Sequence, residues 1–148
     1  MQQKVFTAKV IWSQIDANNH LRHSAYADLA CQARIDVLES LGITNAKMME
    51  LGIGPIITEE RTFYKREVAP NTTVTINCKL ASSREDGARY SFVQETFRED
   101  GVLAAVLVIT GAWLNLKTRR LSIPPEEFTK TLLENMERTD DCDIYKKK

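Results

Sequence analysis

The sequence predicts an α+β domain in which one long helix packs on an antiparallel sheet of about five strands, followed by a short C-terminal helix. Two observations carry this prediction. After Ser24, apolar residues recur at steps of three and four over one long segment, as a single helix face requires. From Pro55 to Leu116, segments rich in β-branched residues alternate with turn sequences. The chain has 148 residues, of which 43% are hydrophobic, and this is enough for one core.

The N-terminal part of the chain is expected to hold the first strand, a polar loop and the long helix. Residues 5–12 alternate loosely in polarity and predict a strand with Trp12 on its apolar face. Residues 13–23 are polar and predict a loop. The helix should begin near Ser24, whose hydroxyl can cap it, and end near Gly42, because glycine often closes a helix.

Four more strands and the short helix should follow. The predicted strands are residues 55–68, 73–80, 89–98 and 102–116. The sequences Glu85-Asp86-Gly87 and Glu99-Asp100-Gly101 predict hairpin turns between the last three strands. Ser122 can cap the short helix, since two prolines and two acids come directly after Ile123. We expect one domain over residues 1–138 and a frayed, charged tail over residues 139–148.

Charge and cysteine content narrow the expected partners and compartment. Lys plus Arg and Asp plus Glu number 20 each, so the zero net charge gives no support for a nucleic-acid partner. The three cysteines, Cys31, Cys78 and Cys142, cannot all pair within one chain, and their spacings match no zinc or redox motif. We therefore expect reduced thiols in a cytoplasmic protein, with no bound metal. No segment has the length and apolarity of a membrane span.

The loop before the long helix carries the most informative pattern. Residues 11–21 read Ile-Trp-Ser-Gln-Ile-Asp-Ala-Asn-Asn-His-Leu, and Tyr26 follows at the start of the helix. This pattern resembles the signature of the 4-hydroxybenzoyl-CoA thioesterase-like family, in which Asp, Gly or Asn, and His precede a Tyr. It is also similar to the Asp-x-Asn-x-His loop of plant acyl-carrier-protein thioesterases. The resemblance implies the hotdog fold and hydrolysis of an acyl thioester.

The chain departs from the family pattern at three places. Gln14 stands where family members often have a second acid, and Asn19 stands where glycine is common before the His. The stretch Arg22-His23-Ser24 replaces a frequent asparagine pair. These departures leave the predicted scaffold unchanged and concern the substrate class and the detailed mechanism.

Asp16 is the first candidate for the chemistry. Thioester hydrolysis needs an activated water or a nucleophile, and a group that stabilises the oxyanion. The resemblance implies that Asp16 is either the general base or the nucleophile; by itself, an aspartate in this loop would more often be a turn residue. The backbone N–H groups of His23 and Ser24, at the start of the helix, are the predicted oxyanion donors, because such groups lack partners within a helix.

Other residues are supporting candidates. Asn18 could orient the water or the Asp16 carboxylate, and His20 could be either catalytic or structural. Tyr26 lies on the apolar helix face, so we expect it to pack. Glu59 and Glu60 are possible second acids, although such a cluster is more often solvated. The candidates for the phosphates of coenzyme A stand at strand ends: Arg84, Arg89 and Arg119, together with Lys117 and Arg120.

Two alternatives to a thioesterase remain open from the sequence. Related hotdog hydratases and dehydratases place the His three residues after the Asn, whereas His20 follows Asn18 by two. A non-catalytic acyl-CoA-binding domain would share the fold without the chemistry. For the thioesterase and for both alternatives, the expected ligand is an acyl-CoA or acyl-carrier-protein thioester, with no cofactor beyond the coenzyme A of the substrate. An exposed sheet edge favours self-association, so we expect a homodimer or tetramer.

Overall fold

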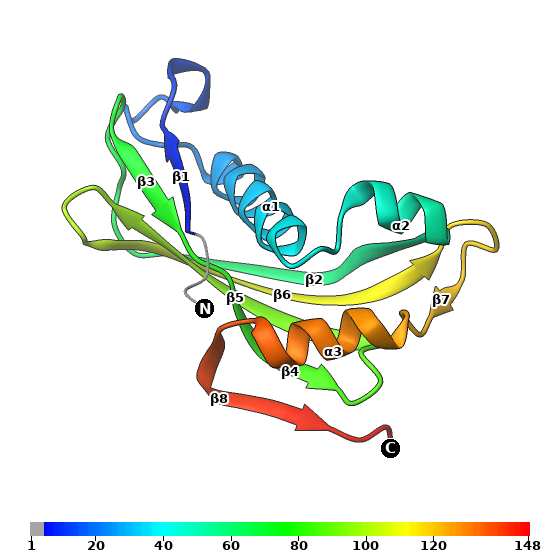
Figure 1. The fold of residues 1–148 in the computed structure, drawn as a ribbon. Helices are drawn as coiled ribbons and strands as arrows, with labels where there is room; N and C mark the ends of the chain where they lie inside the picture. The colour runs from blue at the N-terminus through cyan, green and yellow to red at the C-terminus, as the bar shows by residue number, and fades with distance from the viewer. Residues whose placement is uncertain (1–4) are drawn as a thin grey trace.

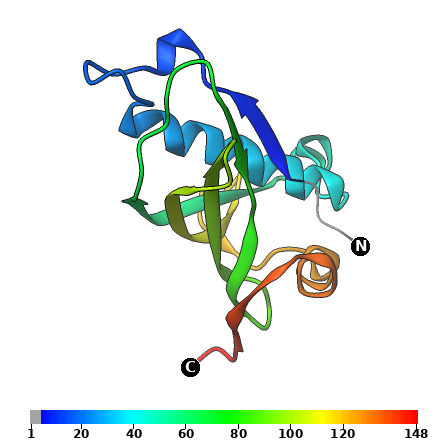
Figure 2. The same ribbon diagram turned by 90° about the vertical axis from the view of Figure 1, so that its left-hand side faces the viewer.

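The computed structural model describes residues 5–148, so residues 1–4 of the predicted domain lie outside its description. The long helix α1 (His23–Ser40) lies against a curled sheet, with α2 (Asn45–Leu51) and α3 (Glu126–Asn135) beside it (Figures 1 and 2). The strands are β1 (Phe6–Lys9), β2 (Ile53–Tyr64), β3 (Thr73–Ile76), β4 (Lys79–Arg84), β5 (Arg89–Arg98), β6 (Leu103–Asn115), β7 (Leu121–Ser122) and β8 (Arg138–Tyr145). The predicted α+β class, with one long helix on a mainly antiparallel sheet, is confirmed, but the sheet has eight strands instead of about five, and β8 pairs in parallel.

The eight-stranded sheet is built around β5. One side of β5 pairs with β6, and the other side pairs with β3 and β4, which follow each other end to end. Beyond them, β1 pairs with β3, and β8 pairs with β4 in parallel. On the far side, β2 pairs with β6, and within residues 5–148 no second strand pairs with it. The twelve-residue strand β2 is therefore a free sheet edge.

The buried stripe of α1 explains how it lies against the sheet. Its buried residues recur at three- and four-residue steps and include Ala25, Ala30 and Ala33, whose small side chains permit a close approach. The helix ends at Ser40, and Gly42, with φ +83°, closes it two residues later, near the predicted position. Ser24 does not cap the helix: its neighbour Arg22 is the N-cap residue, without a side-chain capping bond, and the Ser24 hydroxyl accepts a hydrogen bond of 2.8 Å from Arg22 Nε.

Two predicted strands differ from the structure. Trp12 is not on an apolar strand face, because the pairing of β1 with β3 ends at Lys9 and the chain then forms a short 3-10 helix, Trp12–Gln14. Trp12 is 79% exposed there. Residues 73–80 form two strands instead of one. The break lies at Asn77, whose side-chain amide exchanges hydrogen bonds of 2.8 and 2.9 Å with the backbone N–H and side chain of Glu95.

The C-terminal segment also differs. The expectation of a frayed end is wrong for Arg138–Tyr145, which forms β8 through backbone pairing with β4. Ser122 does not cap α3: it lies in β7, and Pro125 is the N-cap residue. Helix α2 was not predicted, although Thr44 caps it by accepting a hydrogen bond of 3.1 Å from the Lys47 N–H. None of the helices within residues 5–148 is long and apolar enough to cross a membrane.

Close packing at Gly111 in β6 gives a first testable prediction. A Cβ atom there would lie 2.4 Å from Cζ of Tyr90, which is 5% exposed and contacts the rings of Phe92 and Trp113. Because this buried ring must shift to admit the Cβ atom, Gly111→Ala should lower the free energy of unfolding by about 1–3 kcal/mol. Urea denaturation measures the change.

Gly54→Ala is the matched control for Gly111→Ala. A Cβ atom at Gly54 would lie 3.4 Å from Cδ2 of Leu116, close to an ordinary contact. We expect a change within about 0.5 kcal/mol, as for most substitutions without a clash. Equal effects of the two substitutions would contradict the packing described at Tyr90.

Candidate active site

The loop around Asp16 is held in shape by the Asp16 side chain itself. Asp16 Oδ1 accepts hydrogen bonds from the backbone N–H groups of Asn18 (2.9 Å) and His20 (3.1 Å). The Asp16 N–H donates to the carbonyl of His20 at 2.9 Å, and Asn19 takes a left-handed conformation with φ +61°. Within residues 5–148, no group donates a hydrogen bond to Oδ2. One carboxylate oxygen therefore shapes the loop, and the other is free for a ligand or water.

Asp16 lines a hollow of about 320 Å³ at the start of α1. The residues His20, Tyr26, and Tyr64 with the three residues after it also line it. The side chains of Asp16 and His20 are partly buried. No group of three or more His, Cys, Asp or Glu side chains within residues 5–148 is arranged to hold a metal ion, in this hollow or elsewhere.

The helix start opens into the same hollow through His23, the first residue of α1. The N–H of Ala25 donates to the carbonyl of Arg22 at 3.0 Å. Within residues 5–148, no group accepts a hydrogen bond from the N–H of His23 or Ser24. Arg22 anchors the turn because its N–H donates to the carbonyl of Gln14 at 2.8 Å and its Nη1 donates to the carbonyl of Ser13. Two free donors at the positive end of a helix dipole are suited to an oxyanion.

Two tyrosines connect the helix start to the end of β2. The Tyr64 hydroxyl donates to the carbonyl of His23 at 3.2 Å, and its ring lies edge-on to Tyr26, 5.3 Å between centroids. Tyr26 is 5% exposed, which agrees with the packing role expected for it. Burial, together with the nearby Tyr64 and Asp16, raises the pKa of Tyr26, so its phenol stays neutral. The pair fixes the wall of the hollow and is not a source of charge.

The other acid and amide side chains predicted for the site, those of Asn18, Glu59 and Glu60, do not line the Asp16 hollow. Asn18 is exposed, and its backbone N–H, not its side chain, is the group bonded to Asp16. Glu59 and Glu60 are exposed in the middle of β2 and do not line the hollow. Glu59 forms an ion pair of 2.7 Å with Arg61. Within one subunit, the structure does not bring Glu59 or Glu60 to Asp16.

The predicted phosphate-binding arginines do not gather at Asp16 within one subunit. Arg84 binds both carboxylate oxygens of Asp86, at 2.7 Å each. Arg89 begins β5, and Arg119 lies exposed in the turn after β6 with φ +61°. Lys65 and Arg66, which no motif in the sequence marked as candidates, are exposed and line the hollow directly after β2. Their adjacency to a strand end was visible in the sequence, but their proximity to the loop was not.

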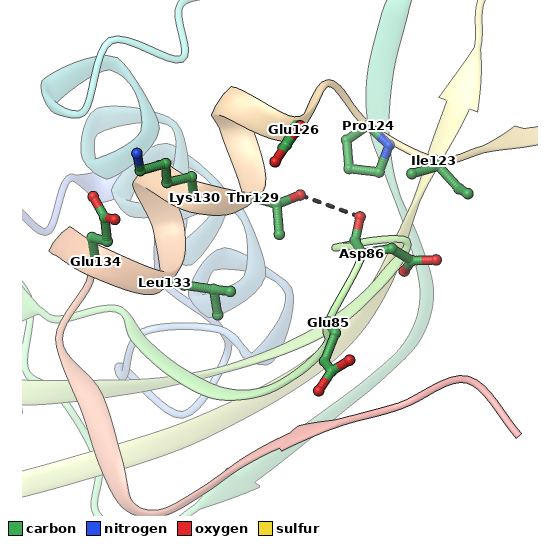
Figure 3. Close-up of a pocket in the computed structure, with 9 residues that line it drawn as sticks. All are labelled: Glu85, Asp86, Ile123, Pro124, Glu126, Thr129, Lys130, Leu133 and Glu134. Atoms are coloured by element: carbon green, nitrogen blue, oxygen red, sulfur yellow. Dashed lines mark hydrogen bonds between the residues drawn. The ribbon is translucent and has the colours of Figure 1, made fainter.

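A larger hollow of about 470 Å³ lies between α3 and the turn from β4 to β5 (Figure 3). Four of the side chains around it are carboxylates (Glu85, Asp86, Glu126, Glu134), and Lys130 is its one cation. The Thr129 hydroxyl closes one side by donating to the carbonyl of Asp86 at 3.3 Å. Its excess negative charge disfavours the phosphates of coenzyme A. The chemistry therefore favours the smaller hollow at Asp16 as the active site.

The sequence identifies the family independently of this geometry. The chain belongs to the Thioesterase-like superfamily, whose family model matches residues 10–132. The match covers the Asp16 loop, α1 and the strands from β2 to β7. Comparison with curated proteins gives no match.

Solved structures share the same fold at low sequence identity. A hypothetical protein from Staphylococcus aureus, solved in complex with CoA, is 22% identical over 94% of this chain and 89% of its own, with a TM-score of 0.84. The DHNA-CoA thioesterase from Staphylococcus aureus is 21% identical over 80% of this chain and 78% of its own, with a TM-score of 0.75. The 1,4-dihydroxy-2-naphthoyl-CoA thioesterase from Synechocystis is 11% identical over 88% of this chain and 96% of its own, with a TM-score of 0.78. The predicted hotdog fold is therefore confirmed.

Proposed function

We propose that this protein hydrolyses an acyl thioester of coenzyme A to a free acid and a thiol, with Asp16 as the general base. The observation that carries the proposal is the shared hollow: it is lined both by Asp16, whose Oδ2 is free, and by His23, the first of the two residues with unpaired N–H groups at the start of α1. A carboxylate beside two free amides is the pairing of base and oxyanion donors that acyl transfer requires. Membership in the Thioesterase-like superfamily agrees with this chemistry.

In the proposed reaction, Oδ2 of Asp16 takes a proton from water while the water oxygen bonds to the thioester carbonyl carbon. The negative charge that develops on the carbonyl oxygen is stabilised by the N–H groups of His23 and Ser24. When the tetrahedral intermediate breaks down, the C–S bond is cleaved and the proton passes to the leaving thiolate. Asn18 and His20, which lie in the same loop as Asp16, are proposed to position the water or the carbonyl group of the substrate.

Asp16 could instead attack the carbonyl directly and form a mixed anhydride. A single turnover in ¹⁸O-labelled water tests for this path. Water that opens the anhydride at the aspartyl carbonyl leaves label in the Asp16 side chain, which mass spectrometry of the digested protein detects and which a general base cannot produce. Label in the released acid alone is the result expected for a general base, or for an anhydride that water opens at the acyl carbonyl.

Coenzyme A is the proposed carrier because basic side chains stand at the mouth of the hollow. Lys65 and Arg66 are exposed there and can pair with phosphate oxygens. An acyl carrier protein presents the same phosphopantetheine arm and is the alternative carrier. The reaction needs no cofactor beyond the substrate, and the three unpaired cysteines agree with a reducing, cytoplasmic setting.

We also propose a homodimer that forms through the free edge of β2. This strand exposes Ile57 by 44%, Phe63 by 50% and Tyr64 by 54%, which is an unusual amount of apolar surface beside unpaired backbone groups. If two β2 edges paired antiparallel about a two-fold axis, their backbone groups would form hydrogen bonds and their apolar side chains would be covered. The Tyr64 end of one strand then lies beside the Ile53 end of its partner, so the partner subunit borders the Asp16 hollow. The turn that holds Arg119 leads to this same end, because Ile53 pairs with Asn115.

A direct assay tests the proposed function. The purified protein is incubated with acyl-CoAs of different length and with benzoyl-CoA, and free thiol is measured; hydration of an enoyl-CoA is followed in parallel. We expect thiol release with at least one acyl-CoA. Hydration without thiol release would instead identify a hydratase, and binding without either reaction would identify a non-catalytic domain.

A further inference from the structure

A second, smaller hollow lies between α1 and the sheet, beside the free edge of β2. It has a volume of about 130 Å³. Its walls are mostly apolar and come from four elements: Ile35 and Leu38 of α1, Pro55 and Ile57 of β2, Phe92 of β5, and Ile109 of β6. One charged side chain, Arg34 of α1, also lines it.

Arg34 is a buried cation without a carboxylate partner. It is 8% exposed, and its Nη1 donates to Oε1 of Gln94 at 2.7 Å. Gln94 is fully buried and held by its own bond of 2.9 Å to the carbonyl of Ala30, so it orients the guanidinium without neutralising it. Within residues 5–148, no carboxylate forms an ion pair with Arg34, and its Nε and Nη2 donate no hydrogen bond.

The titratable groups near Arg34 do not supply the missing negative charge. Burial raises the pKa of Cys78 to about 12, so its thiol stays protonated. Burial also raises the pKa of Tyr90 well above its usual value, and its phenol stays neutral. A guanidinium in such surroundings is costly unless an anion pairs with it. An anionic group bound in the hollow would therefore stabilise the Arg34 guanidinium.

We infer that this hollow binds the end of the acyl group and that Arg34 selects acyl groups that end in a carboxylate. A carboxylate would accept hydrogen bonds from the free guanidinium N–H groups while its methylene chain contacts the apolar walls. The volume is that of about four water-sized groups, which fits a short dicarboxylic acid. The inference rests on the proposed thioesterase function and specifies its substrate class.

The position of Arg34 suits the proposed dimer. At a rise of about 1.5 Å per residue, Arg34 lies roughly 16 Å along α1 from His23, too far for a short acyl group bound at the same subunit's helix start. Antiparallel pairing of two β2 edges brings Tyr64, at the Asp16 hollow, beside Pro55 to Ile57 of the partner subunit, which wall this second hollow. The acyl end would then enter the second hollow of the partner.

Matched pairs of substrates test the inference on the unmodified protein. Succinyl-, glutaryl- and adipoyl-CoA are each compared with the acyl-CoA of equal carbon number that lacks the terminal carboxylate. We expect kcat/KM for at least one dicarboxylic substrate to exceed that of its pair by about 10- to 100-fold, as for a hydrogen bond to a charged group. The difference should lie mainly in KM, because the carboxylate binds far from the reacting carbonyl.

Arg34→Met, which keeps the length and apolar stem of the side chain, should remove this preference. We expect kcat/KM for the carboxylated substrate to fall to the level of its uncharged pair, when both are measured on the same variant. Arg34→Lys keeps the charge but loses the planar donors, so it should retain part of the preference. Unchanged preference in Arg34→Met overturns the inference.

The failure of this inference is distinguishable from failure of the proposed function. Hydrolysis of the uncharged acyl-CoAs without preference for any carboxylated one overturns the role of Arg34 and leaves the thioesterase standing. No thiol release from any substrate overturns the proposed function and this inference with it. If Arg34→Met does not fold, the comparison of carboxylated and uncharged acyl-CoAs on the unmodified protein still tests the predicted substrate preference.

Discussion

Asp16→Asn is expected to lower kcat for thiol release by about 100-fold or more, because it removes the proposed general base. The asparagine carbonyl can still accept the hydrogen bonds from the N–H groups of Asn18 and His20 that Oδ1 accepts in the native loop. The loop should therefore keep its shape and the thermal unfolding midpoint should change little. Steady-state kinetics and a thermal melt measure the two effects on the same sample.

Asp16→Ala separates the structural role of this carboxylate from its chemistry. It loses the base and also leaves two backbone N–H groups without their acceptor, so it should be less stable than Asp16→Asn while being no more active. Asp28→Asn is the matched control, since Asp28 is an exposed aspartate of α1 that does not line the hollow. Near-native activity in Asp16→Asn would move the chemistry elsewhere, and Glu59 and Glu60 would be tested next.

Phe63→Lys is expected to dissociate the proposed dimer and to lower activity by about tenfold or more. Phe63 is 50% exposed on the free edge of β2, where a lysine at a strand edge opposes pairing with a second strand. Loss of the dimer should lower activity because the partner subunit borders the Asp16 hollow in the proposed dimer. Sedimentation velocity at micromolar concentration measures the mass, and the thiol-release assay measures activity.

Tyr145→Lys controls for the general effect of removing exposed apolar surface. Tyr145 is 37% exposed in β8, which pairs with β4 on the other side of β5 from β2. This variant should keep the mass and activity of the unmodified protein. A monomeric native protein, or a dimeric and fully active Phe63→Lys variant, would contradict assembly through β2.

The elements predicted most accurately from the sequence are those with a regular apolar pattern and a turn sequence at each end. β5 occupies residues 89–98 as predicted, because its alternating pattern is bounded by Glu85-Asp86-Gly87 and Glu99-Asp100-Gly101. β8 was missed because its charged sequence carries no apolar period; backbone pairing along the edge of β4 stabilises it. The break at Asn77 was missed because a side-chain amide there substitutes for ladder hydrogen bonds, and local sequence does not show that substitution.

The same distinction applies to the site. The position of Asp16 near the helix start is encoded locally, so the loop motif and the onset of the helical period were enough to predict it. Lys65 and Arg66 were missed because their position depends on which strand end lies beside the loop, a property of the sheet and not of their own segment. Arg34 was missed because it interrupts an apolar helix stripe, and nothing local shows that it is buried without a carboxylate.

The most direct test of the central claim is a crystal structure with a non-hydrolysable acyl-CoA analogue. The claim is that the Asp16 carboxylate and the N–H groups at the start of α1 act on one carbonyl. We expect the analogue's carbonyl oxygen at about 2.7–3.1 Å from the backbone nitrogens of His23 and Ser24, with Asp16 Oδ2 facing the carbonyl carbon or a water beside it. An analogue whose carbonyl lies in the hollow beside α3, or an Asp16 side chain turned to bulk solvent, would contradict the account.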